Sequence, residues 1–290
     1  MLPTERVNQS IGNENPLSDE TDYACVTNAG FPPPAGSAVQ LTAAAWETPA
    51  DPLDLRNGEA HIWRVPLNHG STPADIANLS DAERTRAQRF HSSEHGDRYT
   101  VAHGTLRRIL SRYTGLSAER LHFAAREHGK PYLTNPGNGA EQTIHFNLSH
   151  SADMALVAVS ASGEVGVDVE HWRDDVRHVE IAERFFSVAE RVALRACGTD
   201  LHLVMQAFFA GWSRKEAYIK ASGFGISRGL THFDVSLEAT VPAAILGDRL
   251  DATATSRWSM ADIDVGPGYS AALVATAPLT VIRRYDATSI

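Results

Sequence analysis

The amino-acid sequence predicts an α+β fold built from two similar halves. In each half the patterns predict a strand, then helices, then further strands, an order typical of α+β domains. The segments Arg89–Ser92 and Arg184–Ser187 both read Arg-Phe-x-Ser, and each leads into a predicted helix. We therefore expect two pseudo-symmetric α+β halves, residues 58–160 and 161–290, in a chain of 290 residues.

The first 57 residues are predicted to form a disordered N-terminal extension. They are rich in Asn, Thr, Pro, Ala and Gly, include the run Phe31-Pro32-Pro33-Pro34, and show little apolar periodicity. The folded region is expected to begin near His61–Val65, where apolar and polar residues alternate as in a strand.

The first half is expected to contain two helices and four further strands. Ser80–Glu83 is a capping box that predicts a helix through Arg89. A longer helix is predicted over 94–113, where apolar residues recur at spacings of three and four and Gly115 follows the end. The predicted strands are 121–125, 131–133, 144–148 and 154–159.

The second half is expected to open with a strand over 164–170. Helices are predicted around 176–184, from the capping box Ser187–Glu190 to about 197, and over 201–222. Further strands are expected near 233–237, 256–263 and 269–275. In the last helix Trp212, Glu216 and Lys220 are four residues apart and share one face. That face is an active-site face or a surface ion pair.

Composition excludes some classes of partner. The formal net charge of -9 argues against a general nucleic-acid binder, which needs a basic surface. No apolar run is long enough for a spanning helix, so no membrane contact is expected. Cys25 and Cys197 lack metal-site spacing and are compatible with a reducing compartment. We expect a cytoplasmic monomer.

Lysine is rare in a chain that otherwise uses arginine. Only Lys130, Lys215 and Lys220 are lysines among 26 basic residues. An ammonium is a compact charge that can donate a proton, whereas a guanidinium is a planar fork that stays charged. The three lysines therefore indicate positions where arginine does not serve.

Asp168 and Glu170 indicate a metal site. Lying two apart on a predicted strand, both carboxylates point to one face, with Val165, Val167 and Val169 on the other. With Glu216 they provide three oxygen ligands of the kind that Mg²⁺ prefers. The alternative is a strand end with solvated acids.

Other polar segments admit two interpretations. Asn147–Ser151 ends a strand with four polar residues, which suit phosphate or ribose but are also ordinary in turns. Lys130 lies in a tight turn, where a solvated lysine is common. The arginines of the helix over 94–113 equally fit a solvated face.

Four segments together carry a resemblance. In chain order they are Gly129–Pro131, Phe146–Ser151, Val165–Glu170 and Trp212–Lys220. They resemble the signature motifs of the 4′-phosphopantetheinyl transferases of the large, surfactin-synthetase-activating (Sfp) type. Weaker similarity extends from about Trp63 to Ala275 and excludes residues 1–57.

The resemblance implies a fold, an activity and a site. It implies two pseudo-symmetric α+β halves with coenzyme A in the cleft between them. It implies Mg²⁺-dependent transfer of the 4′-phosphopantetheine arm to a serine of an apo acyl or peptidyl carrier protein, with release of adenosine 3′,5′-bisphosphate. The large type favours carriers of secondary metabolism.

Carried over position by position, the resemblance implies that Asp168, Glu170 and Glu216 hold Mg²⁺ and that Glu216 and Lys220 are catalytic. The residues implied to bind coenzyme A are Arg86, Arg98, Lys130, Ser149, His150, Lys215 and Lys220. The chain departs from the family at Glu83, where a basic residue is common. Binding of the 3′-phosphate is then shared differently, with Arg84 as one candidate.

Two other function classes compete with this hypothesis. A metal-dependent phosphodiesterase could use the same acid and lysine types, although the acidic chain disfavours a nucleic-acid substrate. A non-catalytic module that binds carrier protein or coenzyme A could keep the fold, although the complete acid and lysine set argues against it.

Overall fold

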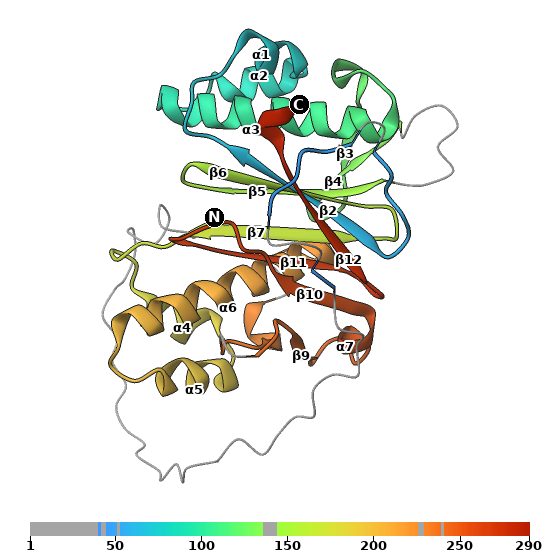
Figure 1. The fold of residues 1–290 in the computed structure, drawn as a ribbon. Helices are drawn as coiled ribbons and strands as arrows, with labels where there is room; N and C mark the ends of the chain where they lie inside the picture. The colour runs from blue at the N-terminus through green and yellow to red at the C-terminus, as the bar shows by residue number, and fades with distance from the viewer. Residues whose placement is uncertain (1–39, 42–44, 51–52, 136–143, 226–228, 239–240) are drawn as a thin grey trace, which may run out of the picture.

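A computed structural model describes residues 40–41, 45–50, 53–135, 144–225, 229–238 and 241–290 (Figure 1). The predicted disorder of residues 1–39 lies outside these ranges. Near the C-terminal end of the predicted extension, Gln40–Leu41 (β1) pairs with Val281–Ile282, and Glu47 bridges to Tyr285. An adjacent strand of the sheet thus supplies backbone partners that the local sequence pattern does not reveal.

The first sheet has five strands in the order β1-β12-β2-β6-β5. Besides β1, these are β12 (Val281–Asp286), β2 (Glu59–Pro66), β6 (Met154–Ser160) and β5 (His145–Ser151). The helices of this half are α1 (Pro73–Asn78), α2 (Asp81–Ala87) and α3 (Ser93–Thr114), followed by η1 (Ala118–Arg120). A hairpin of β3 (Phe123–Ala125) and β4 (Pro131–Leu133) follows.

The second sheet has three strands in the order β10-β11-β7. They are β10 (Trp258–Asp262), β11 (Tyr269–Thr276) and β7 (Val165–His171). The helices are α4 (His178–Phe185), α5 (Val188–Ala196), α6 (Leu201–Ser222) and the short α7 (Ala254–Arg257). Short elements complete this part: η3 (Leu230–His232), β8 (Phe233–Val235), β9 (Ile245–Asp248) and, at the chain end, η4 (Ala287–Ser289).

The elements stack as helices, sheet, sheet and helices, and the predicted α+β fold is confirmed (Figure 1). An apolar layer that includes Ile62, Leu156, Val167 and Leu273 lies between the two sheets. The 22-residue α3 and α6 each pack on an outer face and end at a glycine in the left-handed conformation. None of the described helices combines the length and apolar character needed to cross a membrane.

Side chains join β5 to β7 where the two sheets meet. Among the described strands these two share no backbone ladder. Instead, backbone N–H groups of β7 donate to polar side chains at alternate positions of β5. The three bonds are Val167 to Asn147 (2.9 Å), Val169 to Ser149 (3.4 Å) and His171 to Ser151 (3.1 Å). The period of two places these three side chains on one face of β5.

The last strand returns to the sheet of the first half. β12 runs parallel to β2, with Ile282 opposite Ala60 and Tyr285 opposite Trp63. The chain end lies beside α3 in Figure 1, and Ile290 packs against the core under that helix. The division at residue 160 stays a prediction, and the range 161–290 contributes strands to both sheets.

The absence of a side chain at Gly166 allows α6 to approach β7. A Cβ at position 166 would lie 2.2 Å from the carbonyl oxygen of Ala217 and 2.3 Å from the backbone nitrogen of Ala221. Gly166→Ala is therefore expected to destabilise the protein by about 2 to 3 kcal/mol, because a helix backbone must move. Urea unfolding measures the change. Gly70→Ala, where a Cβ meets nothing within 4 Å, is the control; equal midpoints for the two variants would contradict this packing.

Because His61 is buried, the stability of the protein is expected to fall in acid. Its side chain is fully buried, its Nδ1 lies 2.8 Å from the Tyr113 hydroxyl, and burial lowers its pKa to about 4. The unfolded chain binds this proton near pH 6.5, so the contribution to stability is present above that pH and is lost as pH falls toward 4. We expect a loss of about 2 kcal/mol between pH 7 and pH 5. Urea unfolding at both pH values should show a smaller loss in His61→Gln, and equal losses would contradict the assignment.

Candidate active site

Asp168, Lys220 and Ser149 form a buried polar cluster where β5, β7 and α6 meet. The Lys220 ammonium lies 2.6 Å from Asp168 Oδ1 and donates to Ser149 Oγ at 2.9 Å. Ser149 Oγ in turn donates to Asp168 Oδ1 at 2.9 Å. Asp168 is 0% exposed, whereas 23% of the Lys220 side chain remains exposed. We call these residues, with Glu170 and Glu216, the acid–lysine site.

Glu170 and Glu216 complete the acid–lysine site. Glu170 Oε2 accepts a hydrogen bond of 3.1 Å from Ser151, and Glu216 lies on α6 one turn before Lys220. Burial and the charge of Asp168 raise the pKa of Glu170 to about 7 and raise the pKa of Glu216 above its ordinary value. Burial alone would lower the pKa of Lys220, but the charges of Asp168 and Glu216 outweigh it and raise the pKa. Three carboxylates are therefore gathered around one cation.

The donor atoms of the acid–lysine site are of the kind that bind a divalent cation. Asp168 Oδ2 is buried and has no hydrogen-bond partner among the described residues. A buried carboxylate oxygen without a donor is costly, and a cation compensates it. The three carboxylates are oxygen donors of the type that Mg²⁺ takes. In the described part of the chain no group of three or more His, Cys, Asp or Glu residues already has metal-binding geometry, so binding would require the side chains to move.

Lys215 lies in a different environment from the one predicted. Its side chain is fully buried, and Nζ lies 2.6 Å from both carboxylate oxygens of Glu190 and 2.9 Å from the carbonyl oxygen of Phe233. Glu190 also accepts from the backbone N–H groups of Ser187 and Val235. The three donors of Lys215 tie α6 to α5 and β8, and a contact of Lys215 with the pyrophosphate stays a prediction.

Lys130 is likewise engaged by the protein. Its Nζ donates to Glu164 at 2.6 Å, to the Val165 carbonyl at 3.0 Å and to the Ala221 carbonyl at 2.9 Å. Only 7% of the side chain is exposed. These contacts hold the β3–β4 hairpin against β7 and the end of α6, and the contact of Lys130 with the nucleotide stays a prediction.

Comparison with known proteins identifies the family. A model of the 4′-phosphopantetheinyl transferase superfamily matches residues 164–275, and a model of the 4′-phosphopantetheinyl transferase N-terminal region matches residues 70–162. The 4′-phosphopantetheinyl transferase HetI of Nostoc sp. is 37% identical over 195 residues, which cover 67% of this chain and 80% of the relative. The chain belongs to the 4′-phosphopantetheinyl transferase family. The transferase Sfp of Bacillus subtilis is 30% identical over 214 residues, covering 73% of this chain and 89% of Sfp.

The acid–lysine site of the transferase joins the two matched regions. Ser149 belongs to the N-terminal match, whereas Asp168 and Lys220 belong to the second. The hydrogen bond from Lys220 to Ser149 therefore crosses between them. Membership of this family makes the protein an enzyme.

The remaining predicted residues of the transferase lie on β5, α2 and α3 of the first half. His150 follows Ser149 on β5, and burial lowers its pKa to about 4. Arg98 pairs with Glu94 at 2.8 Å and with Asp153, and Arg86 is exposed with its guanidinium over the Tyr99 ring. Arg86 is thus open to a ligand, whereas Arg98 already has acidic partners.

Trp212, at 2% exposed, belongs to the core of the second half of the transferase. It stacks on Phe208, with ring centroids 5.9 Å apart, and meets the edge of Phe185. The predicted shared face of α6 therefore divides: Glu216 and Lys220 belong to the acid–lysine site, and Trp212 packs in the core.

The contact of Ser151 with Glu170 was not predicted. The position of Ser151 two residues after Ser149 on the same strand was the sequence signal that could have indicated it.

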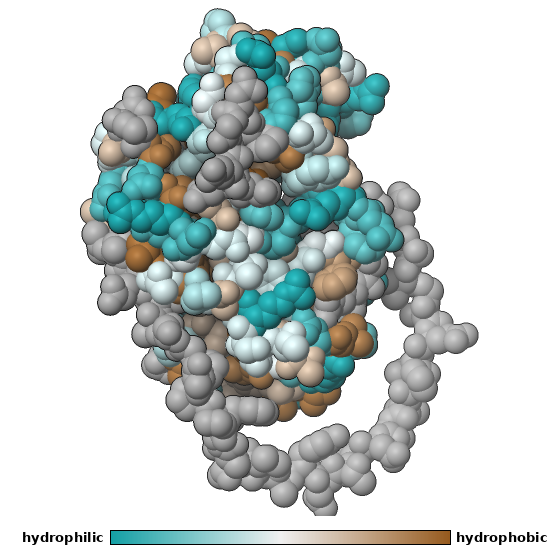
Figure 2. All heavy atoms as spheres, turned by 90° about the vertical axis from the view of Figure 1, so that its right-hand side faces the viewer, coloured by the Kyte–Doolittle hydropathy of each residue, from teal (hydrophilic) through white to brown (hydrophobic). Residues whose placement is uncertain are grey.

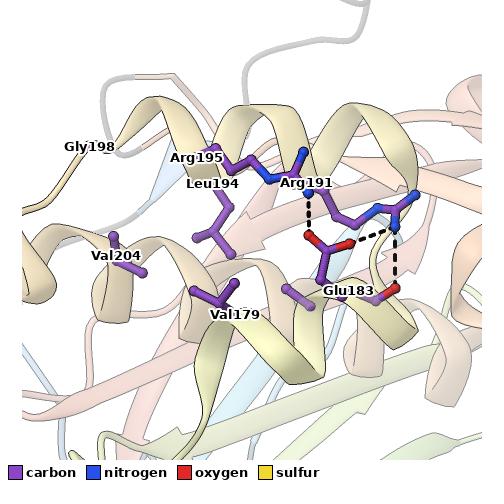
Figure 3. A pocket seen from close by; sticks show the side chains of 8 residues that line it. Val179, Glu183, Arg191, Leu194, Arg195, Gly198 and Val204 are labelled. Atoms are coloured by element: carbon purple, nitrogen blue, oxygen red, sulfur yellow. Dashed lines mark hydrogen bonds and ion pairs between the residues drawn. The ribbon is translucent and has the colours of Figure 1, made fainter. Parts of the chain in front are cut away.

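A hollow between α4, α5 and the start of α6 lies outside the acid–lysine site (Figure 3). It has a volume of about 160 Å³, and Val179, Leu194 and Val204 supply apolar lining. Figure 3 shows Glu183 between Arg191 and Arg195, with Arg191 at 2.8 Å. Exposed ion pairs of this kind contribute little to the stability of the folded protein.

On the face in Figure 2, hydrophilic residues are interspersed with hydrophobic ones.

Proposed function

We propose that the protein transfers the 4′-phosphopantetheine arm of coenzyme A to a serine of an apo acyl or peptidyl carrier protein. The reaction requires Mg²⁺ and releases adenosine 3′,5′-bisphosphate. The observation that carries the proposal is the contact of Lys220 with Asp168 and Ser149, which brings both halves together at one buried group of carboxylates. The family membership supports it.

Asp168, Glu170 and Glu216 would hold Mg²⁺. When bound, the metal supplies positive charge against the pyrophosphate of coenzyme A. The buried oxygen of Asp168 that lacks a donor supports this assignment. Lys220 is open to a substrate, because 23% of its side chain is exposed.

The chemical step is a displacement at the phosphorus that bears pantetheine. The carrier serine oxygen forms a bond to this phosphorus, and the bond from phosphorus to the bridging pyrophosphate oxygen breaks. Glu216 accepts the serine proton, directly or through a water molecule. The bridging oxygen leaves with adenosine 3′,5′-bisphosphate, and the Lys220 ammonium stabilises or protonates it. Ser149 and Asp168 orient that ammonium.

The decisive experiment is the intact mass of an apo carrier protein incubated with this protein, coenzyme A and Mg²⁺. We expect a gain of one phosphopantetheine, prevented by EDTA, together with adenosine 3′,5′-bisphosphate among the nucleotides. Carriers of peptide, polyketide and fatty-acid synthesis should be compared, since the large type favours secondary metabolism. No gain on any carrier despite coenzyme A binding would favour the non-catalytic module. Nucleotide release from DNA or RNA would favour the phosphodiesterase.

The cellular setting is part of the proposal. A cytoplasmic location agrees with the absence of a spanning helix from the described residues and with the location in which carrier proteins and coenzyme A would meet the enzyme. A monomer is proposed because both contributors to the acid–lysine site, β5 and the β7–α6 pair, come from one chain. Light scattering of the purified protein tests this state.

A further inference from the structure

Ser151, at the end of β5, lies directly beside the acid–lysine site. Its hydroxyl oxygen is 3.1 Å from Glu170 Oε2 and 3.1 Å from the backbone nitrogen of His171. Both of these partners belong to β7. One partly buried hydroxyl of β5 therefore contacts a carboxylate and the backbone of the neighbouring strand at the same time.

The backbone contact determines the direction in which the Ser151 hydroxyl donates. A serine hydroxyl carries one hydrogen and two lone pairs. Because the N–H of His171 donates, it occupies a lone pair of Ser151 Oγ. The single hydrogen of the hydroxyl is then donated to Glu170 Oε2. This bond to one carboxylate oxygen restricts the rotation of the carboxylate group.

The same arrangement occurs two residues earlier on β5. Ser149 Oγ donates to Asp168 Oδ1 at 2.9 Å and accepts from the backbone N–H of Val169 at 3.4 Å. Each serine thus contacts the acid that lies 19 residues later in the chain, together with the backbone N–H that follows that acid. The repeat arises because both strands have a period of two. Two acids of β7 are therefore held by two serines of β5 in the same way.

Burial makes the Ser151 hydroxyl difficult to replace. Glu170 is only 3% exposed, so bulk water has little access to its carboxylate. A buried acceptor that loses its donor keeps the cost of its desolvation. Without the hydroxyl, the Glu170 carboxylate is expected to turn away from the orientation that it has in the structure.

We propose that Ser151 is a positioning residue, which holds the Glu170 carboxylate in place for a divalent cation in the acid–lysine site. The inference rests on the proposed function, because it assumes that Asp168, Glu170 and Glu216 hold Mg²⁺. Carboxylates that bind metals are themselves held by hydrogen bonds, and loss of such a partner typically lowers metal affinity by about ten- to a hundredfold. Ser151 acts through Glu170 and needs no contact with coenzyme A or the carrier.

Binding of Mn²⁺ to the full chain tests the proposal. Mn²⁺ takes the same oxygen ligands as Mg²⁺, and electron paramagnetic resonance measures its free concentration. Asp168→Asn identifies the relevant site, because it should abolish binding there. We expect Ser151→Ala to raise the dissociation constant of Mn²⁺ by about tenfold. Ser151→Thr, which keeps the hydroxyl on a residue that suits a strand, should stay within about threefold of the wild-type value.

Asn147→Ala is the matched control for a merely structural role. Asn147 lies on the same face of β5, and its side-chain oxygen accepts from the backbone N–H of Val167 at 2.9 Å. The control therefore removes a contact between β5 and β7 of the same kind, at a position away from Glu170. We expect its dissociation constant for Mn²⁺ to stay within about threefold of the wild-type value. Thermal unfolding shows whether each variant is folded.

Three results would overturn the inference. An unchanged dissociation constant in Ser151→Ala would show that Ser151 does not position the carboxylate, while the loss of binding in Asp168→Asn would still support the metal site. Equal weakening in Ser151→Ala and Asn147→Ala would assign the effect to the contact between the strands. Lack of Mn²⁺ binding by the wild-type protein would overturn the assignment of the metal as well. The measurement needs no carrier, so a failure of transfer does not affect it.

Discussion

Glu216→Gln is expected to lower the rate of transfer by about a thousandfold or more while changing the dissociation constant of coenzyme A by less than about threefold. A positioned general base contributes about 10²- to 10⁴-fold to a rate, and this substitution also removes one carboxylate charge from the acid–lysine site. Glutamine has almost the same shape but accepts no proton. The rate is followed by carrier mass and the affinity by calorimetry, both at saturating Mg²⁺.

A matched control for this prediction is Glu180→Gln. It makes the same chemical change at a side chain on α4 that is 67% exposed and pairs with the exposed Arg177. We expect its rate to equal that of the wild-type protein. Near-normal turnover in Glu216→Gln would remove Glu216 from the proton-transfer role and would leave Asp168 and Glu170 as the acids to test.

Lys220→Arg is expected to lower the rate by about a hundredfold although it conserves the charge. The ammonium lies 2.6 Å from Asp168 and 2.9 Å from Ser149, a separation that a compact group satisfies. A guanidinium is planar and larger, and it does not give up a proton to a leaving group. The variant's rate with saturating coenzyme A and carrier, measured by mass, checks the prediction.

The control for Lys220→Arg is the reverse exchange at an exposed site. Arg195→Lys, at a side chain that is 64% exposed, should leave the rate unchanged. Equal rates for Lys220→Arg and the wild-type protein would show that charge alone matters at this position. Thermal unfolding of both variants separates loss of chemistry from loss of fold.

The sequence predicts those parts of the candidate site in which the relation between residues follows from local spacing. Asp168 and Glu170 share a face because a strand has a period of two, and Glu216 and Lys220 share one because a helix turn has nearly four residues. These relations survive folding, and the structure joins them through Ser149. The alternation of valines with acids on β7 was also correct, although both faces of the strand proved buried.

The sequence did not reveal which lysines would be held by distant protein groups and which would be open to a substrate. Lys215 and Lys220 are five apart on α6, and both lie in the same motif, yet only the packing of α6 on α5 and β8 sends Lys215 to Glu190. Lys130 meets Glu164 and the end of α6 through tertiary contacts alone. A motif gives residue types at spacings, and the assignment of each ammonium to protein or substrate depends on partners distant in sequence.

Some elements were missed although a signal existed. Thr72-Pro73 with Asp75 forms a capping box with proline at the first turn, which predicts the start of α1. β12 was missed because Arg283 and Arg284 interrupt its apolar character, and a strand of mixed character is not assigned to a sheet centre by its own pattern.

The position of β12 in the first sheet determines when that sheet can be completed during synthesis. Residues 59–160 leave the ribosome early, but β2 lacks its parallel neighbour until residues 281–286 have emerged. Until then one edge of β2 carries unpaired backbone groups, and edges of that kind invite pairing with other chains. Synthesis of residues 281–286 is therefore the event that supplies the missing neighbour of β2, and a ribosome stalled before Val281 holds a nascent chain with that edge of β2 unpaired.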